Sequence, residues 1–281
     1  MYFWKRPSWA TFIFVLVFLP AALLAQTNCD EGSGQMNRND PRGITPQDII
    51  QKFAAKEAVF KQARDNYTYT QDVTVQTLDG SSVDGEFKEV TDITYNDRGQ
   101  RNENVTFAPQ PSLTRVSMSK EDFDDIRNKM PFVLTTEDLP DYSILYQGSQ
   151  HVDEIDTYVF DVAPKHIDKG KRYFQGRIWV DIHDFQIVKT CGKSVPDIHG
   201  KNNENLMPKF VTYREQIDGQ YWFPTYTRAD DNLHFSNGDV HIREIIKYTN
   251  YKRFGSRSRI IFQGEVPPEQ QNQQQNKKPP K

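Results

Sequence analysis

The chain has 281 residues, of which 36% are hydrophobic and 12% aromatic, and its 35 Lys and Arg oppose 38 Asp and Glu for a formal net charge of −3. This aromatic content is enough for a folded core, whereas the near-neutral charge provides no concentrated basic surface, so nucleic acid is not an expected partner. Two cysteines are too few for a disulfide-framework mini-protein or a cysteine-based zinc module, and one long apolar stretch excludes a multi-span membrane protein.

The first segment of the chain has the features of an export signal. Lys5 and Arg6 precede an uncharged apolar run, residues 9–25, which contains Pro20 and ends in small residues. A basic start, an apolar centre and small residues at the end are typical of a secretory signal peptide, so residues 1–25 are predicted to be one. The run is short for a membrane span, which makes an uncleaved anchor the less favoured interpretation.

Cys29, just after this segment, allows two further interpretations. Acylation of Cys29 would make the protein a lipoprotein, but the residues before it depart from the small residues that usually precede an acylated cysteine. Export also implies an oxidising compartment, in which Cys29 and Cys191 could form a disulfide. Residues 26–44 are polar and aperiodic and are predicted to be a flexible linker, so the sequence does not favour this pairing.

Two helices are predicted in the folded part, which spans residues 45–262. Thr45 suits the N-cap and Pro46 the first helical position, and apolar residues then recur at helical spacing to about Arg64. Farther along, a serine followed three residues later by an aspartate marks the start of a short inserted helix at 120–129.

Long strands make up most of the remaining chain. In residues 67–78, Tyr67, Tyr69, Val73 and Val75 alternate with polar residues, the period of two that marks a half-buried strand. Similar patterns predict strands at 83–95, 100–107, 113–118, 142–150, 154–163, 172–181, 184–191, 208–218, 221–230 and 239–251. Because these strands do not alternate with helices, the fold class is mainly β (α+β), with an antiparallel sheet of about eleven strands.

The last residues, 263–281, differ in composition from the rest of the chain. Gln, Asn and Pro dominate, and Val266 is the one apolar residue. Such a segment cannot bury enough apolar surface to order itself, so a disordered tail is predicted.

The sequence carries no common catalytic signature: GxSxG, HExxH, P-loop and GxGxxG motifs are all absent. His183 lies at an expected hairpin corner, where polar residues are usual. A looser acidic and histidine cluster, whose spacing matches no metal motif, comprises Asp230, Asp231, His234 and His241. A hydrolase or metal enzyme built on this cluster is the third-ranked hypothesis. We therefore predict no enzyme activity, no catalytic residue, no metal site and no cofactor.

Aromatic side chains are concentrated in the predicted strands. A single sheet with one amphipathic helix cannot cover two apolar faces, so the sheet must curl around its own side chains or leave a concave apolar surface. An ordinary core explains most of these residues, and the functional interpretation is an apolar ligand pocket covered by the helices. The candidate pocket residues are Phe53, Phe60, Tyr69, Phe87, Tyr95, Phe160, Trp179 and Trp222.

Two stretches of the chain resemble a known family. In the first, Gly176-Arg177-Ile178-Trp179-Val180-Asp181 is followed, after a turn, by Phe185-Gln186-Ile187-Val188-Lys189. In the second, a strand ends at Asp218-Gly219 and the next begins with aromatic residues and Pro224. On these motifs residues 45–262 resemble the LolA/LolB-like superfamily of envelope proteins. The matched positions belong to the β framework, so no catalytic residue is carried over.

This resemblance implies an antiparallel half-barrel whose concave apolar face is covered by the N-terminal and inserted helices. Members of the superfamily bind lipids or the acyl chains of lipoproteins in the periplasm, or sense the state of the envelope. The function implied here is a periplasmic, non-catalytic carrier that binds a lipid or lipoprotein acyl chain, with peripheral contact to the membrane. The alternative is an interaction or sensor module that uses the half-barrel to dock an envelope protein partner.

Overall fold

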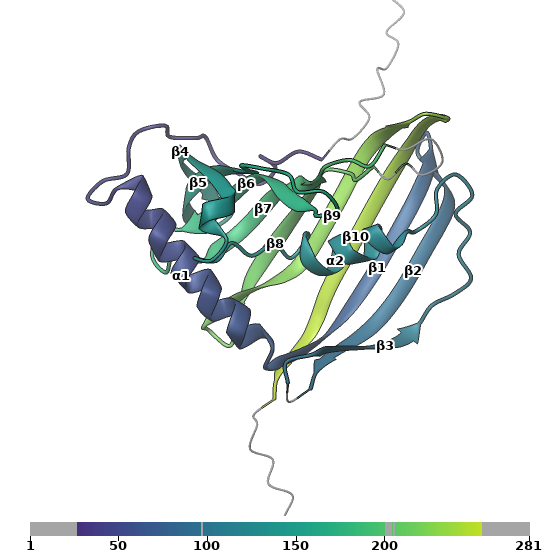
Figure 1. The fold of residues 1–281 in the computed structure, drawn as a ribbon, viewed down its shortest axis with the longest axis horizontal. Coiled ribbons are helices and arrows are strands. Elements are labelled where there is room, and N and C mark those ends of the chain that lie inside the picture. The colour runs from purple at the N-terminus through teal and green to yellow at the C-terminus, as the bar shows by residue number, and fades with distance from the viewer. Residues whose placement is uncertain (1–26, 97, 200–203, 205, 255–281) are drawn as a thin grey trace, which may run out of the picture.

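The computed structural model describes residues 27–96, 98–199, 204 and 206–254. The predicted signal peptide and the predicted disordered tail lie outside these residues. Two α-helices and one large sheet dominate this part of the chain (Figure 1). No helix in it is both long and apolar enough to cross a membrane.

A single antiparallel sheet forms the framework of the described residues, in the spatial order β3-β2-β1-β10-β9-β8-β7-β6-β5-β4. Its strands are β1 (Tyr67–Asp79), β2 (Ser82–Tyr95), β3 (Arg101–Phe107), β4 (Tyr142–Val152), β5 (Ile155–Pro164), β6 (Tyr173–Asp181), β7 (Ile187–Val195), β8 (Phe210–Ile217), β9 (Tyr221–Phe235) and β10 (Gly238–Arg253). The first and last strands pair with each other, whereas β3 and β4 form the two edges of the sheet. The sheet is therefore curved but open (Figure 1), which confirms the predicted antiparallel half-barrel.

The described residues form ten strands rather than about eleven, because residues 113–118 are not a strand. A backbone hydrogen bond from Ser112 to Glu86 holds the start of this segment on β2 at 2.9 Å. The chain then leaves the sheet, and Val116 and Met118 pack against the core. The apolar alternation of this segment thus reflects packing across the concave face and not pairing at an edge.

Both predicted helices are present and are capped as expected. Helix α1 (Pro46–Arg64) begins after Thr45, whose hydroxyl accepts a hydrogen bond from the Asp48 backbone N–H. Helix α2 (Lys120–Asn128) begins after Ser119 with the same reciprocal arrangement, in which the acid three residues later bonds back to the cap. These capping boxes satisfy backbone N–H groups that have no partner inside the helix.

The two helices cover different parts of the concave face (Figure 1). Helix α1 crosses the β5–β9 half of the sheet, where the ring of Phe53 lies 5.6 Å from Phe160 and the ring of Phe60 lies 5.1 Å from Phe223. Helix α2 crosses the other half, and its Phe123 ring lies 5.7 Å from Phe87 on β2.

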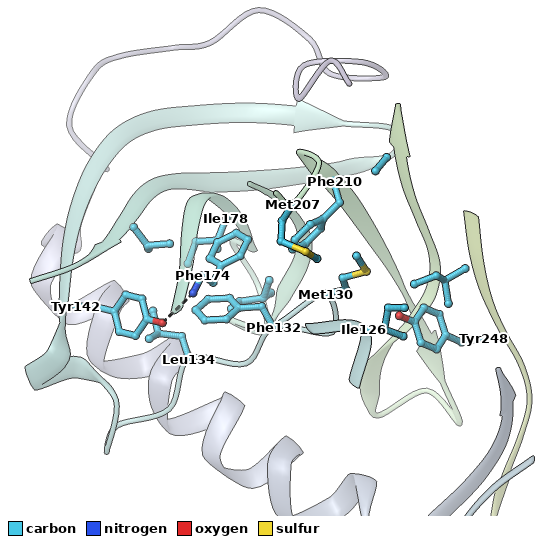
Figure 2. Packing of buried hydrophobic residues seen from close by; sticks show 14 of the residues in the cluster. Ile126, Met130, Phe132, Leu134, Tyr142, Phe174, Ile178, Met207, Phe210 and Tyr248 are labelled. Carbon is cyan, nitrogen blue, oxygen red and sulfur yellow. Dashed lines mark hydrogen bonds between the residues drawn. The ribbon is translucent and has the colours of Figure 1, made fainter. Parts of the chain in front are cut away.

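The chain that follows α2 fills the centre of the concave face, as Figure 2 shows. Phe132 stacks on Phe174 of β6 with ring centroids 4.3 Å apart, and Met130 and Leu134 are fully buried beside it. The backbone N–H of Phe174 donates a hydrogen bond to the hydroxyl of Tyr142, which closes this cluster at the β4 side. The main core thus lies between the sheet and the two helices.

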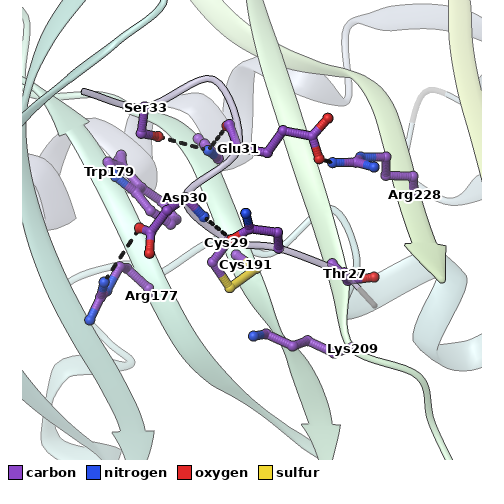
Figure 3. Close-up of a disulfide and its surroundings, with 12 residues drawn as sticks. Thr27, Cys29, Asp30, Glu31, Ser33, Arg177, Trp179, Cys191, Lys209 and Arg228 are labelled. Carbon is purple, nitrogen blue, oxygen red and sulfur yellow. Dashed lines mark hydrogen bonds and ion pairs between the residues drawn. A yellow bond between two sulfur atoms is a disulfide. The ribbon is translucent and has the colours of Figure 1, made fainter. Parts of the chain in front are cut away.

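Residues 27–43 differ from the flexible linker that their composition predicts. This segment lies against the convex face, where Cys29 forms a disulfide with Cys191 of β7 (Figure 3). Farther along, Ser33 and Asn37 bridge to the outer edge of β4. The disulfide and these backbone bonds supply the stability that a polar, aperiodic sequence lacks by itself.

Lys189 of β7 is buried beneath this segment. Its ammonium donates to the Glu31 carbonyl at 3.0 Å and to the Ser33 hydroxyl at 3.1 Å, and it lies 4.7 Å from the centre of the Trp179 ring. Burial lowers the pKa of Lys189 to about 8, and the nearby carboxylate of Asp30 opposes the change. The N-terminal segment thus supplies the polar partners that a buried ammonium requires.

The disulfide also decides between the two interpretations of Cys29. Its sulfur is bonded to Cys191, so it is not available for the thioether that a lipoprotein anchor requires. Reduction should lower the free energy of unfolding by about 2–5 kcal/mol, because the bond joins residues separated by 162 positions. Urea unfolding with and without dithiothreitol tests this. As a control, the unfolding midpoint of a Cys29→Ser/Cys191→Ser variant should not change with dithiothreitol. If reduced and oxidised wild type unfold at the same urea concentration, the prediction is wrong.

Candidate ligand site on the concave face

Six of the eight predicted pocket residues lie on the concave side of the sheet, but they do not form one group. Phe53 and Phe60 of α1 pack against strand residues in the filled half of the core. Phe160 is fully buried under Phe53, and Phe87 packs against α2. These four side chains therefore belong to the core that holds the helices on the sheet.

Tyr69 packs at the margin of that core, and Tyr95 lies on the neighbouring strand β2, next to the edge strand β3. The hydroxyl of Tyr69 accepts a hydrogen bond of 2.7 Å from Arg101, and its ring stacks on Tyr251 with centroids 5.2 Å apart. Tyr95 is half-buried and pairs in register with Arg101. Burial raises the pKa of Tyr69 to about 12, so this hydroxyl stays protonated at neutral pH.

Trp179 and Trp222 lie on the convex side, contrary to the predicted concave pocket. On β6 the side chains of Phe174, Ile178 and Val180 join the concave core, which places Trp179 on the opposite face. There the indole N–H of Trp179 donates to Gln150 at 2.8 Å, and the indole of Trp222 donates to Asp184 at 2.8 Å. Trp179 shares its face of β6 with Gln175 and Arg177, so the alternation itself separates it from the apolar face.

A cavity of about 400 Å³ lies on the concave side between the approach to α2 and the β9–β10 hairpin. None of the eight predicted residues lines it. Its apolar lining includes Val75, Val116, Met118, Ile126, Leu206, Met207, Phe235 and Ile242. The volume falls within the range of small-molecule sites.

Glu244 of β10 is the unusual member of the cavity lining. Its side chain points to the concave face between Ile242 and Ile246 and is 4% exposed. No hydrogen bond or ion pair joins it to another described residue. Burial, with a contribution from the carboxylates of Asp122 and Asp125, raises the pKa of Glu244 to about 8. A buried carboxyl group without a partner is costly, so this position is a candidate for ligand recognition.

Among the described residues, the charged groups around Glu244 are mostly acidic. Asp122 and Glu204 line the same cavity, and Asp125 lies nearby on α2. Arg115 also lines the cavity, but its guanidinium is bound to Asp84 at 2.7 Å. The described lining thus holds more acidic than basic side chains, which favours cationic over anionic groups.

No protein-family model matches the chain, and no curated protein matches it significantly. Among solved structures, it is similar to a DUF1329 family protein from Desulfovibrio piger at 16% identity, with a TM-score of 0.36 over 71% of this chain and 91% of that one. It is also similar to MucB, at 10% identity and a TM-score of 0.22 over 69% and 92% of the two chains. A third match is the MucA/MucB complex of Pseudomonas aeruginosa, at 9% identity, with a TM-score of 0.20 over 72% and 100%. These TM-scores lie below 0.5, so the likenesses assign no function to this chain.

Three members of the predicted acidic and histidine cluster form ion pairs on the β9–β10 hairpin, whereas Asp231 accepts a hydrogen bond from the Lys209 backbone N–H. Asp230 lies between His241 and Arg243, and His234 pairs with Asp239 at 2.8 Å near the hairpin end. Within the described ranges, no group of three or more His, Cys, Asp or Glu side chains is arranged to hold a metal ion. Cross-strand charge pairing explains these residue types without a catalytic role.

One feature of the sequence does indicate this cavity. Glu244 is in phase with Ile242 and Ile246, so a strand with one buried face places a carboxyl group among apolar side chains. An acid in such a position has either a partner or a function.

Proposed function

We propose that this protein is exported to the periplasm and binds the single chain of an amphiphile, such as a lipid or a lipoprotein acyl group, in the concave cavity. The cavity beside the approach to α2 is the observation that carries the proposal, because it combines space with apolar side chains on the concave face. Its apolar lining suits a chain, and its polar members suit a head group at one end. The predicted role is binding and release, with no chemical step.

Co-purified lipid is the direct test. Native mass spectrometry with lipid extraction, on protein purified from its own envelope, should find one amphiphile for each chain. Addition of a single-chain amphiphile to the empty protein should raise its melting temperature, because a ligand that binds only the native state stabilises it.

A variant that fills the cavity makes the test specific. Ile242→Trp places an indole in the space, whereas Leu145→Trp places the same group at a strand position that is 60% exposed. Ligand binding should disappear in the first variant and remain in the second. If wild type carries no amphiphile and its melting temperature does not respond to one, the carrier proposal fails. The alternative, a protein-docking module, would then be tested by a partner pull-down.

A further inference from the structure

Glu244 is the exception among the deeply buried acids of the described chain. Glu57 is fully buried and receives two hydrogen bonds from Arg214 at 3.0 and 3.2 Å. Asp125, which is 1% exposed, lies 2.9 Å from Arg172. Asp181 accepts hydrogen bonds from two backbone N–H groups in the turn after β6. Among the described residues Glu244 has no such partner, and it lines a cavity in which another molecule could supply one.

The surroundings of Glu244 limit the chemistry of that molecule. A carboxylate or phosphate head would meet Asp122 and Glu204, and the basic residue of the described lining, Arg115, is held by Asp84. A hydroxyl head would satisfy one hydrogen bond and leave this excess of acidic side chains unopposed. A protonated amine would supply both hydrogen-bond donors and a compensating charge, which makes it the best match.

We propose that the cavity takes an amphiphile with a protonated primary amine, whose ammonium binds the Glu244 carboxylate while its chain lies along Val75, Met118 and Ile242. This inference rests on the proposed function and names the class of ligand. It also predicts a proton linkage. Free Glu244 is largely protonated at pH 7 because burial raises its pKa, so the carboxyl group must release a proton when the ammonium binds.

The groups that face Glu244 set the direction of the pH dependence. The carboxylates of Asp122 and Asp125 on α2 act on it, and Arg115 and Glu204 line the same cavity. An aliphatic amine stays protonated well above neutral pH, like a lysine side chain. Affinity for the amine should therefore increase between pH 6 and pH 8, and a neutral amphiphile should show no such increase.

Three probes with the same alkyl chain test the proposal: dodecylamine, dodecanoate and dodecanol. Isothermal titration of the full chain below the aggregation concentration of each probe, in about 0.3 M salt to screen surface charge, gives the three affinities. Dodecylamine should bind at least about tenfold more tightly than dodecanoate, and Glu244→Gln should remove this preference. The variant should bind dodecanol as well as wild type does.

The matched control is Glu215→Gln, which makes the same chemical change at an exposed position of β8. It should leave all three affinities unchanged. If Glu244→Gln does not fold, as judged by circular dichroism, Glu244→Met gives the same comparison with an apolar side chain of similar length.

The outcomes separate this inference from the proposed function. If no probe binds to wild type, the proposed function itself fails. If the probes bind equally well and Glu244→Gln changes nothing, chain binding stands and the amine preference is wrong. If the preference for dodecylamine is lost in Glu215→Gln as well, the amine binds the acidic surface and not the cavity, and the inference is again wrong.

Discussion

Replacement of Arg214 by methionine should lower the free energy of unfolding by about 3–5 kcal/mol, because it leaves the Glu57 carboxylate buried without its partner. Arg214 and Glu57 are both fully buried, and the guanidinium also donates to the carbonyls of Phe132 and Ile187. One side chain thus joins β8 to α1, to the segment after α2 and to β7. Urea unfolding of the variant measures the loss.

Two further variants show whether the cost arises from the unpaired charge. Glu57→Leu combined with Arg214→Met removes both charges and should recover most of the stability, since a buried ion pair contributes little beyond its apolar equivalent. Lys193→Met removes a partly exposed ion pair with Asp197 and should cost less than about 1 kcal/mol. A cost for Arg214→Met no larger than that of Lys193→Met would contradict the prediction.

The loss of unfolding free energy caused by Arg214→Met should become smaller as the pH falls. Burial raises the pKa of Glu57, and Arg214 opposes this rise. Without the guanidinium the carboxyl group would take up a proton more readily, and the neutral form is less costly to bury.

Glu244→Gln should make the protein more stable than wild type at alkaline pH but not at acidic pH. The pKa of Glu244 is about 8 in the folded protein, against 4.5 for the group in its ordinary state. Below about pH 4.5 the carboxyl is protonated in both states, and the variant and wild type should be similar. Between pH 4.5 and pH 8 the group keeps its proton in the folded state and releases it on unfolding. The free energy of unfolding of wild type therefore falls by up to about 4 kcal/mol relative to that of the variant.

Denaturant unfolding of both proteins at intervals from pH 4 to pH 9 measures this difference. Asp122, Asp125, Arg115 and Glu204 are common to both proteins, so their own titration largely cancels in the comparison. Glu215→Gln should follow the wild-type curve throughout. A stability difference between Glu244→Gln and wild type that does not change with pH would contradict the assignment of a raised pKa.

Local patterns were sufficient to predict the elements of this fold. The capping residues Thr45 and Ser119 correctly indicated where both helices begin. Period-two alternation predicted eleven strands, and ten of them are present in the described part of the chain. Gly176 in the β6 motif has a reason in the framework of the sheet. A Cβ atom there would lie 2.2 Å from the Cys191 carbonyl oxygen on the neighbouring strand.

Contacts between distant segments could not be predicted in the same way. Glu57 and Arg214 are separated by 157 positions, and nothing in the helix pattern of the first indicates the second. Cys29 lies in a polar stretch that has no periodicity, so its attachment to β7 depends on tertiary structure. The polar residues Gln175 and Arg177 in phase with Trp179 did indicate its face of β6, but which face of the sheet is concave depends on its curvature.

The two edges of the sheet are not equivalent, and this restricts how copies of the chain can assemble. Ser33 and Asn37 already occupy part of the outer edge of β4, whereas β3 pairs with β2 alone among the described strands and exposes Val105 and Phe107. Edge-to-edge growth into a filament needs two complementary free edges on every copy. With one edge occupied, pairing through β3 can join two copies about a twofold axis and then ends, so the N-terminal segment also acts against open-ended polymerisation.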